Sequence, residues 1–142
     1  MKYRVDCYIP KAFEAIEKVR IKDNNKDNNK DNNNNYIGFF DNEGYIPNEY
    51  KGYIASLGAN IIQAGIRAAL VFYEQEESGS RSDKRLVNAA IRYIISNDGD
   101  FSNYKLSEVL KKLPQENWQQ KAEEIMDAAT ALKLALRTYK MK

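Results

Sequence analysis

The chain has 142 residues, 43 % hydrophobic and 30 % charged, and its 22 basic and 20 acidic residues give a net charge of +2. This composition predicts a single globular domain, and no apolar run approaches the ~20 residues that a membrane span needs. The sequence has no histidine, which excludes Ser-His-Asp and Cys-His catalysis, histidine-containing zinc sites and the Glu-x-x-His di-iron sites of helical bundles. A net charge of +2 does not by itself indicate nucleic-acid binding, so any such argument depends on where the basic residues lie.

The first residues and the cysteine content bear on location. The N-terminus alternates charged and apolar residues and lacks the continuous apolar core of a signal peptide. The single cysteine, Cys7, has no partner for an internal disulfide. We therefore expect a cytoplasmic protein, because the cytoplasm keeps thiols reduced.

The first helix is predicted over residues 9–21. Pro10 suits the first helical position, where its missing N–H would be unpaired anyway. The following apolar residues recur at helical spacing; they are Ala12, Phe13, Ile16 and Val19.

Residues 22–35 contain the unit KDNN three times and nothing that can be buried. Such a tract predicts a disordered polar loop, since it cannot offset its own ordering entropy. A calcium-binding EF-hand that starts at Asp31 would need glycine where Tyr36 stands and glutamate where Asn42 stands. The tract thus fits a repeat expansion in a surface loop better than a calcium site.

The remaining helices are predicted to assemble around a long central helix, which contains the apolar stretch 50–73 and ends near Glu77. One apolar row steps by four and three residues: Tyr50, Ile54, Leu57, Ile61, Ala64, Ala68 and Val71. A second row contains Ile62, Ile66, Ala69 and Tyr73. A helix that is apolar on more than one side is normally surrounded by other helices. Gly52, Gly58 and Gly65 within it predict close approach of another backbone or a bend.

Three further helices are predicted over residues 83–96, with Ser82 as N-cap, 106–113 and 115–140. The last has the most regular apolar spacing, from Trp118 to Tyr139. Its small residues suit packing inside a bundle at least as well as a coiled-coil seam. No segment predicts a strand. The fold class is therefore all-α: a compact single-domain helical bundle of about five helices around a central apolar helix, spanning residues 1–142.

No segment has the spacing of a catalytic or metal site. Gly58 and Gly65 are not followed by Lys-Ser or Lys-Thr, so no phosphate-binding loop is predicted. The acidic pairs at 76–77 and 123–124 are adjacent in sequence and do not face each other on a helix. We expect no catalytic residue, no metal and no cofactor.

Basic residues gather along the third helix and near the C-terminus, and they are the candidate phosphate-binding residues: Arg81, Lys84, Arg85, Arg92, Lys133, Arg137 and Lys140. Two purely structural roles compete with phosphate binding. Cations late in a helix complement its macrodipole, and surface Lys and Arg maintain solubility. Arg67 is unusual in the apolar helix; we expect it to extend from a polar strip with Gln63 and Glu74 rather than to meet a partner.

The run LGANIIQAGIRAALVFYE, residues 57–74, resembles the signature of the small helical subunit of the Cmr complex, the RNA-targeting type III-B CRISPR effector. The residues that carry the resemblance are Ile61, Ile62, Gln63, Gly65, Ile66, Ala69 and Phe72. The helical layout agrees as well, whereas Gly58–Ala59 replace a proline that is common in the family, and the KDNN tract is unusual. The motif is a packing pattern, so it identifies a scaffold rather than a site.

The resemblance implies a non-catalytic subunit that stacks with copies of itself and with other Cmr subunits. It would help to hold the target RNA beside the guide RNA, with the candidate basic residues on the RNA backbone. No membrane and no small-molecule substrate are implied.

Two alternatives remain. One is a helical protein–protein adaptor with no nucleic-acid role, anchored by Trp118 or by the aromatic residues Tyr36, Phe39, Phe40 and Tyr45. The other is a histidine-free enzyme, which would need a cleft with strongly shifted carboxylate or lysine pKa values.

Overall fold

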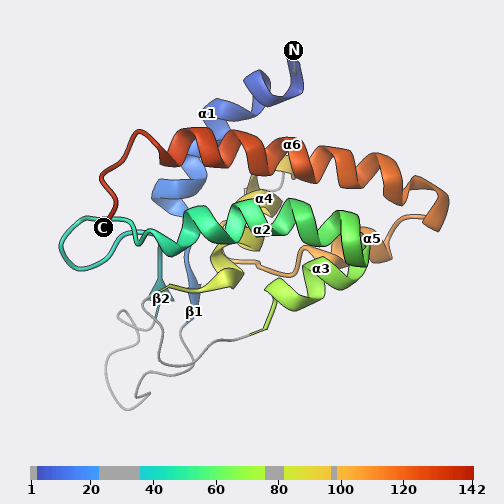
Figure 1. The fold of residues 1–142 in the computed structure, drawn as a ribbon, viewed down its shortest axis with the longest axis horizontal. Helices are drawn as coiled ribbons and strands as arrows, with labels where there is room; N and C mark the ends of the chain where they lie inside the picture. The colour runs from blue at the N-terminus through green and yellow to red at the C-terminus, as the bar shows by residue number, and fades with distance from the viewer. Residues whose placement is uncertain (1–2, 23–35, 76–81, 97–98) are drawn as a thin grey trace.

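The computed structural model describes residues 3–22, 36–75, 82–96 and 99–142. These residues form six α-helices, one turn of 3-10 helix and one short strand pair, so the all-α prediction is confirmed (Figure 1). In chain order the elements are α1 (Tyr3–Lys18), β1 (Ile21–Lys22), β2 (Tyr36–Ile37), α2 (Glu49–Ala64), α3 (Ile66–Tyr73), α4 (Lys84–Ile95), α5 (Ser107–Lys111), η2 (Gln115–Asn117) and α6 (Trp118–Leu136). None of the helices in the described ranges is long and apolar enough to cross a membrane.

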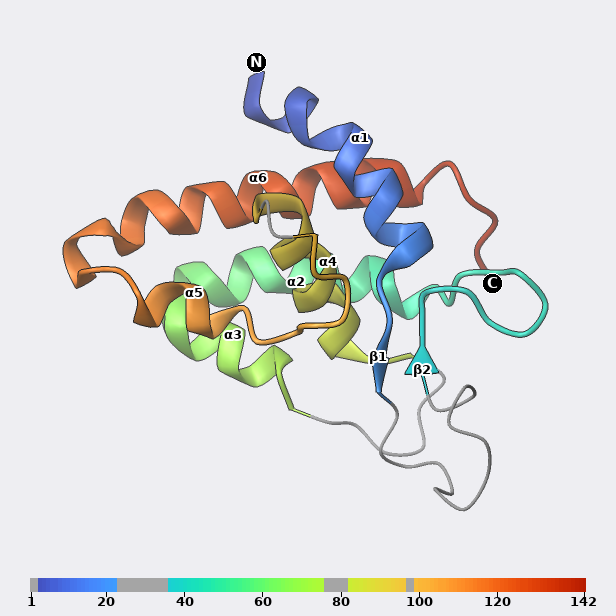
Figure 2. The same cartoon turned by 180° about the vertical axis from the view of Figure 1, so that it is seen from behind.

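The most buried helix is α4. It contacts α1, α2, α3 and α6, and every residue from Ser82 to Ile91 is buried. In front of it, α2 and α6 run side by side in opposite directions, and α1 crosses α6 (Figures 1 and 2). The predicted long helix is therefore one wall of the bundle, and α4 occupies the position with helices on most sides.

The predicted long helix is divided into α2 and α3 at Gly65. This residue has φ +93° and ψ 156°, a conformation that is almost restricted to glycine. Its carbonyl oxygen accepts the first hydrogen bond of α3 from the Ala69 N–H at 3.1 Å. Of the two roles considered for the glycines of this helix, Gly65 has that of a bend, and the predicted single helix is interrupted there. A Cβ added at Gly52 would have no atom within 4 Å, so no close approach explains that glycine.

The first helix begins six residues earlier than predicted, at Tyr3. Val5 is buried and Ile9 half-buried, and both extend the apolar stripe of Ala12 and Ile16 toward the N-terminus. Pro10 consequently lies inside α1 rather than in its first turn. In Figures 1 and 2 the N-terminal part of α1 projects beyond α6.

The third and last helices also differ at their ends. Asp83, not Ser82, is the N-cap of α4. The last helix stops at Leu136, because the following segment pairs with the chain before α2. There the Ile46 N–H donates to the Lys140 carbonyl at 3.0 Å, and the Lys142 N–H donates to the Ile46 carbonyl at 3.1 Å.

A short strand pair was not predicted. Ile21 pairs with Ile37 and Lys22 with Tyr36 in an antiparallel ladder of two residues per strand. Two residues are too short to produce the alternation by which strands are recognised. Lys22 therefore belongs to β1, and the rest of the predicted polar loop lies outside the described residues.

We predict opposite effects for alanine at two glycines of the same wall. Gly65→Ala should lower the free energy of unfolding by about 1–3 kcal/mol, because alanine does not readily adopt the conformation at the α2–α3 junction. Gly52→Ala should raise it by up to about 1 kcal/mol, because that residue is exposed and helical. Urea unfolding of both variants measures the difference; equal effects would contradict a required break at Gly65.

Candidate nucleic-acid and subunit interface

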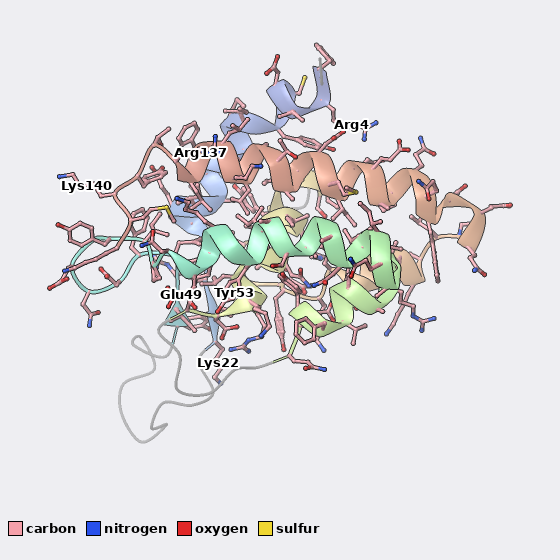
Figure 3. All side chains as sticks on the ribbon, viewed as in Figure 1. Arg4, Lys22, Glu49, Tyr53, Arg137 and Lys140 are labelled. Carbon is pink, nitrogen blue, oxygen red and sulfur yellow. The ribbon has the colours of Figure 1, made fainter. Side chains whose placement is uncertain are left out.

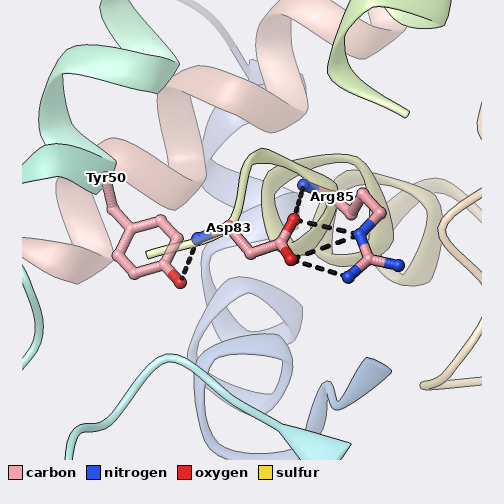
Figure 4. A network of polar contacts seen from close by, with 3 residues as sticks. All are labelled: Tyr50, Asp83 and Arg85. Carbon is pink, nitrogen blue, oxygen red and sulfur yellow. Dashed lines mark hydrogen bonds and ion pairs between the residues drawn. The ribbon is translucent and has the colours of Figure 1, made fainter. Parts of the chain in front are cut away.

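Arg85, one of the predicted phosphate-binding residues, lies inside the fold in an ion pair with Asp83 (Figure 4). Its Nη2 donates to Asp83 Oδ2 at 2.7 Å and its Nε to Asp83 Oδ1 at 3.0 Å, and both side chains are at most 5 % exposed. The guanidinium carbon also lies 5.1 Å from the Tyr104 ring centroid. Arg85 is therefore held by interior contacts and does not reach the surface.

Asp83 makes two further hydrogen bonds at the start of α4. Its Oδ1 accepts the Arg85 backbone N–H at 3.0 Å, which caps the helix, and its own N–H donates to the Tyr50 hydroxyl at 3.1 Å. Burial raises the pKa of Tyr50 above its usual value, so the phenol stays neutral. The network connects α2 to the first turn of α4.

Lys84 is also enclosed, at 8 % exposure. Its ammonium nitrogen lies 5.0 Å from the Phe72 ring centroid and 5.9 Å from that of Tyr53. The Tyr53 hydroxyl in turn shares a hydrogen bond of 2.7 Å with Ser82 Oγ. Cation–π contacts of this kind offset part of the cost of burying a charge, and they assign Lys84 to the junction of α2, α3 and α4.

The other predicted basic residues lie nearer the surface but do not form one stripe. Arg92 and Lys133 are half-buried on α4 and α6, and Arg137 and Lys140 are exposed. Because α6 ends at Leu136, Lys140 does not continue the helical spacing of Lys133 and Arg137. Figure 3 shows Lys140 beyond the end of α6 and apart from Arg137. Arg81 lies outside the described residues.

The family-like signature is split between the core and the surface. Ile61 and Ala69 are buried, whereas Ile62 is 76 % and Phe72 50 % exposed. Of the other signature residues, Gln63 and Gly65 are exposed and Ile66 is half-buried. The second apolar row of the predicted helix thus lies partly in solvent, although we expected neighbouring helices to cover it.

An apolar groove of about 820 Å³ lies between α2, α3 and the start of α6, and Ile66 of this row lines it. Its main apolar walls are Ile61, Ile66, Val71, Phe72, Trp118 and Ala122. A second hollow of about 650 Å³ between α2 and α6 adjoins it at Ile61. Contiguous apolar surface of this kind is typical of protein–protein contacts.

Arg67 lies at the edge of this groove, with its guanidinium carbon 6.0 Å from the Trp118 ring centroid. The Trp118 Nε1 donates to the Leu110 carbonyl at 3.2 Å, which fixes the ring. Glu74 accepts instead from the Ser107 N–H at 2.7 Å and from Ser107 Oγ at 2.9 Å. The predicted polar strip is therefore replaced by an Arg67–Trp118 contact and a separate Glu74–Ser107 contact.

Three basic residues that lie far apart in sequence line one further pocket, of about 300 Å³, where α4, α5 and α6 meet. They are Arg92, Lys112 and Lys121. The sequence pattern indicated only Arg92, because the convergence depends on how three helices pack. Within the described residues, no three cysteine, aspartate or glutamate side chains are grouped so that they could hold a metal ion.

Comparison with known proteins gives a family match. The family model described as CRISPR-associated protein (Cas_Cmr5) matches residues 40–139. This range includes every helix from α2 to α6 and the whole signature run. No curated protein and no solved structure was found to match the chain.

We predict that Asp83→Ala lowers the free energy of unfolding by about 3–5 kcal/mol, because it leaves Arg85 buried without its carboxylate. Glu43→Ala is the matched control, because it also removes an ion pair. Glu43 pairs with Lys142, and both side chains are more than half exposed. The control should cost less than about 1 kcal/mol. Urea denaturation measures both, and a similar small loss in the two variants would contradict the central role of Asp83.

Proposed function

Because the chain belongs to the CRISPR-associated Cas_Cmr5 family, we propose that it is a non-catalytic structural subunit of an RNA-guided, RNA-targeting Cmr effector complex. Membership means that the chain is a Cmr complex subunit and associates with other Cmr subunits. The observation that carries the proposal is the family match over residues 40–139, which confirms the resemblance found in the signature run. A cytoplasmic location accords with this role.

Contacts with further copies of the chain and with other subunits would use the apolar groove at α2, α3 and α6. Val71 and Phe72 line this groove and leave large apolar areas in water. Burial of such area contributes about 25 cal/mol per Å² before the costs of association. The surface supports stacking because it adjoins the second hollow along the α2–α6 wall.

RNA contacts would be made by those predicted basic residues that reach solvent: Arg92, Lys133, Arg137 and Lys140. We assign Lys84 and Arg85 to the fold instead, because aromatic rings and Asp83 enclose them. Arg81 stays a candidate. Such contacts to phosphates would be independent of RNA sequence and would weaken with salt.

The alternative function is a helical adaptor that binds only proteins. The observation that favours it is the half-buried Trp118 in the wall of the apolar groove, since tryptophan is enriched among interface hot spots. Among the other predicted anchors, Tyr36 and Phe40 are exposed, Tyr45 is half-buried, and Phe39 is buried against Tyr50.

The decisive experiment is purification of the tagged protein from its own cells, with mass spectrometry and RNA sequencing of what accompanies it. Recovery of other Cmr subunits together with guide RNA is the expected result. Recovery of unrelated proteins without RNA would favour the adaptor.

We predict that Arg137→Glu weakens binding of single-stranded RNA on the order of fivefold at low salt, because it replaces a phosphate contact with repulsion. Lys51→Glu is the control, since Lys51 is exposed on α2 and the change in charge is the same. Fluorescence anisotropy with labelled RNA measures both affinities. Equal affinities for the two variants would remove Arg137 from the RNA surface.

A further inference from the structure

We propose that the corner where α4, α5 and α6 meet binds the phosphate groups of a single-stranded nucleic acid. The proposal rests on the RNA-binding role proposed above. Of the residues named there, Arg92 lies at this corner, and Lys112 and Lys121 are new candidates. The pocket at this corner has a volume of about 300 Å³, enough for about ten water molecules. It can therefore accept a hydrated phosphate group, and it is at the small end of the range for organic ligands.

Among the described residues that line the pocket, the charged ones are mainly basic. Arg92 comes from the last turn of α4, Lys112 from the C-cap of α5 and Lys121 from the first turn of α6. Glu108 is the carboxylate among the described lining residues. Three elements thus direct cations toward one small volume, as a phosphate-binding site requires.

A fourth cation lies at the edge of the pocket. The Lys11 ammonium of α1 donates to the carbonyl oxygen of Ser96 at 3.3 Å, and Ser96 lines the pocket. The same ammonium lies 5.5 Å from the Tyr93 ring centroid. Lys11 is therefore held in place by the C-terminus of α4 and adds to the positive potential there.

Helix-end electrostatics account for only part of this charge. Lys11 and Arg92 complement the negative C-terminal end of α4, and Lys112 does the same for α5. Lys121 lies in the first turn of α6, where the macrodipole favours acidic residues and where none is present. Its ion pair with Glu124, at 2.8 Å, is partly exposed and correspondingly weak. The described cations at the corner therefore create a potential that favours an anion.

An adjoining hollow favours a polymer over an isolated phosphate ion. It has a volume of about 250 Å³ and meets the first pocket at Leu113. Arg67 and Lys111 line it beside Trp118, and its described lining residues include no carboxylate. Two neighbouring cationic hollows with an aromatic ring match the combination by which proteins hold single strands, namely phosphate contacts and a surface for base stacking.

The test uses the full chain, a short labelled single-stranded RNA of mixed sequence and, separately, inorganic phosphate. Lys112→Gln/Lys121→Gln removes two of the cations, and Lys18→Gln/Lys51→Gln is the control with the same change in charge at exposed positions on α1 and α2. Circular dichroism and urea unfolding of both variants show that each one folds. Anisotropy gives RNA affinity over a series of salt concentrations, and thermal unfolding with and without phosphate reports the free anion.

We expect the corner variant to bind RNA about tenfold more weakly at low salt and to reduce the slope of log affinity against log salt by about 1.4. The control should stay within about twofold of the wild type, since it leaves the corner intact. Equal RNA affinities for the two variants would overturn the proposal, and so would a wild type that binds neither RNA nor phosphate. A corner variant that loses only the thermal stabilisation by phosphate would identify a free-anion site and likewise overturn it.

The same variants separate this proposal from the proposed function. If the corner variant binds RNA normally and still co-purifies with Cmr subunits and guide RNA, the corner is not the RNA-binding site, and the proposed role as a Cmr subunit is unaffected. If the wild type recovers no Cmr subunits, the subunit role fails whatever the corner binds.

Discussion

The ion pair between Asp83 and Arg85 is the interaction on which the arrangement of the helices depends. The start of α4 lies in the interior, where uncapped backbone N–H groups would have no water to bind. Asp83 caps that end, neutralises Arg85 and presents its own N–H to Tyr50 of α2. Because Tyr104 also lies over the Arg85 guanidinium, one buried carboxylate connects α2, α4 and the segment before α5.

Because α4 occupies the centre of the bundle, α2 and α3 each have one side in contact with it and another side that faces solvent. Since α2 and α3 bury one side of each helix against the bundle, other apolar residues of the signature run, Ile62 and Phe72, lie exposed. The apolar groove and the cationic corner then meet near Trp118 and Arg67, which line both the groove and the hollow beside the corner. A neighbouring subunit that covered the groove would exclude water from this edge and strengthen nearby phosphate contacts. Repetition along a filament would add many such weak contacts together.

Sequence alone was sufficient for the elements whose pattern is local. The helical class and the apolar spacing of α6 follow from residues close in the chain. The sequence allowed a bend at any of three glycines, and the structure has it at Gly65. The family was also recognisable, because its signature is one continuous run. Arg85 was misplaced because its burial depends on Asp83 and Tyr104, and only the first of these is a sequence neighbour. Lys112 and Lys121 were missed for the same reason: nothing in their spacing shows that α5 and α6 bring them to Arg92.

The net charge of +2 conceals how the charges are separated in space. Arg4 pairs with Asp127 at 3.2 Å, and Asp127 lines the α2–α6 hollow together with Glu123 and Lys133. Two carboxylates line that hollow, whereas the described residues at the corner of α4, α5 and α6 are three cations and one carboxylate, Glu108. A polyanion is attracted to the local potential of a surface rather than to the total charge of the protein. The corner would accordingly attract RNA more strongly than the α2–α6 hollow, where Glu123 and Asp127 lie beside Lys133.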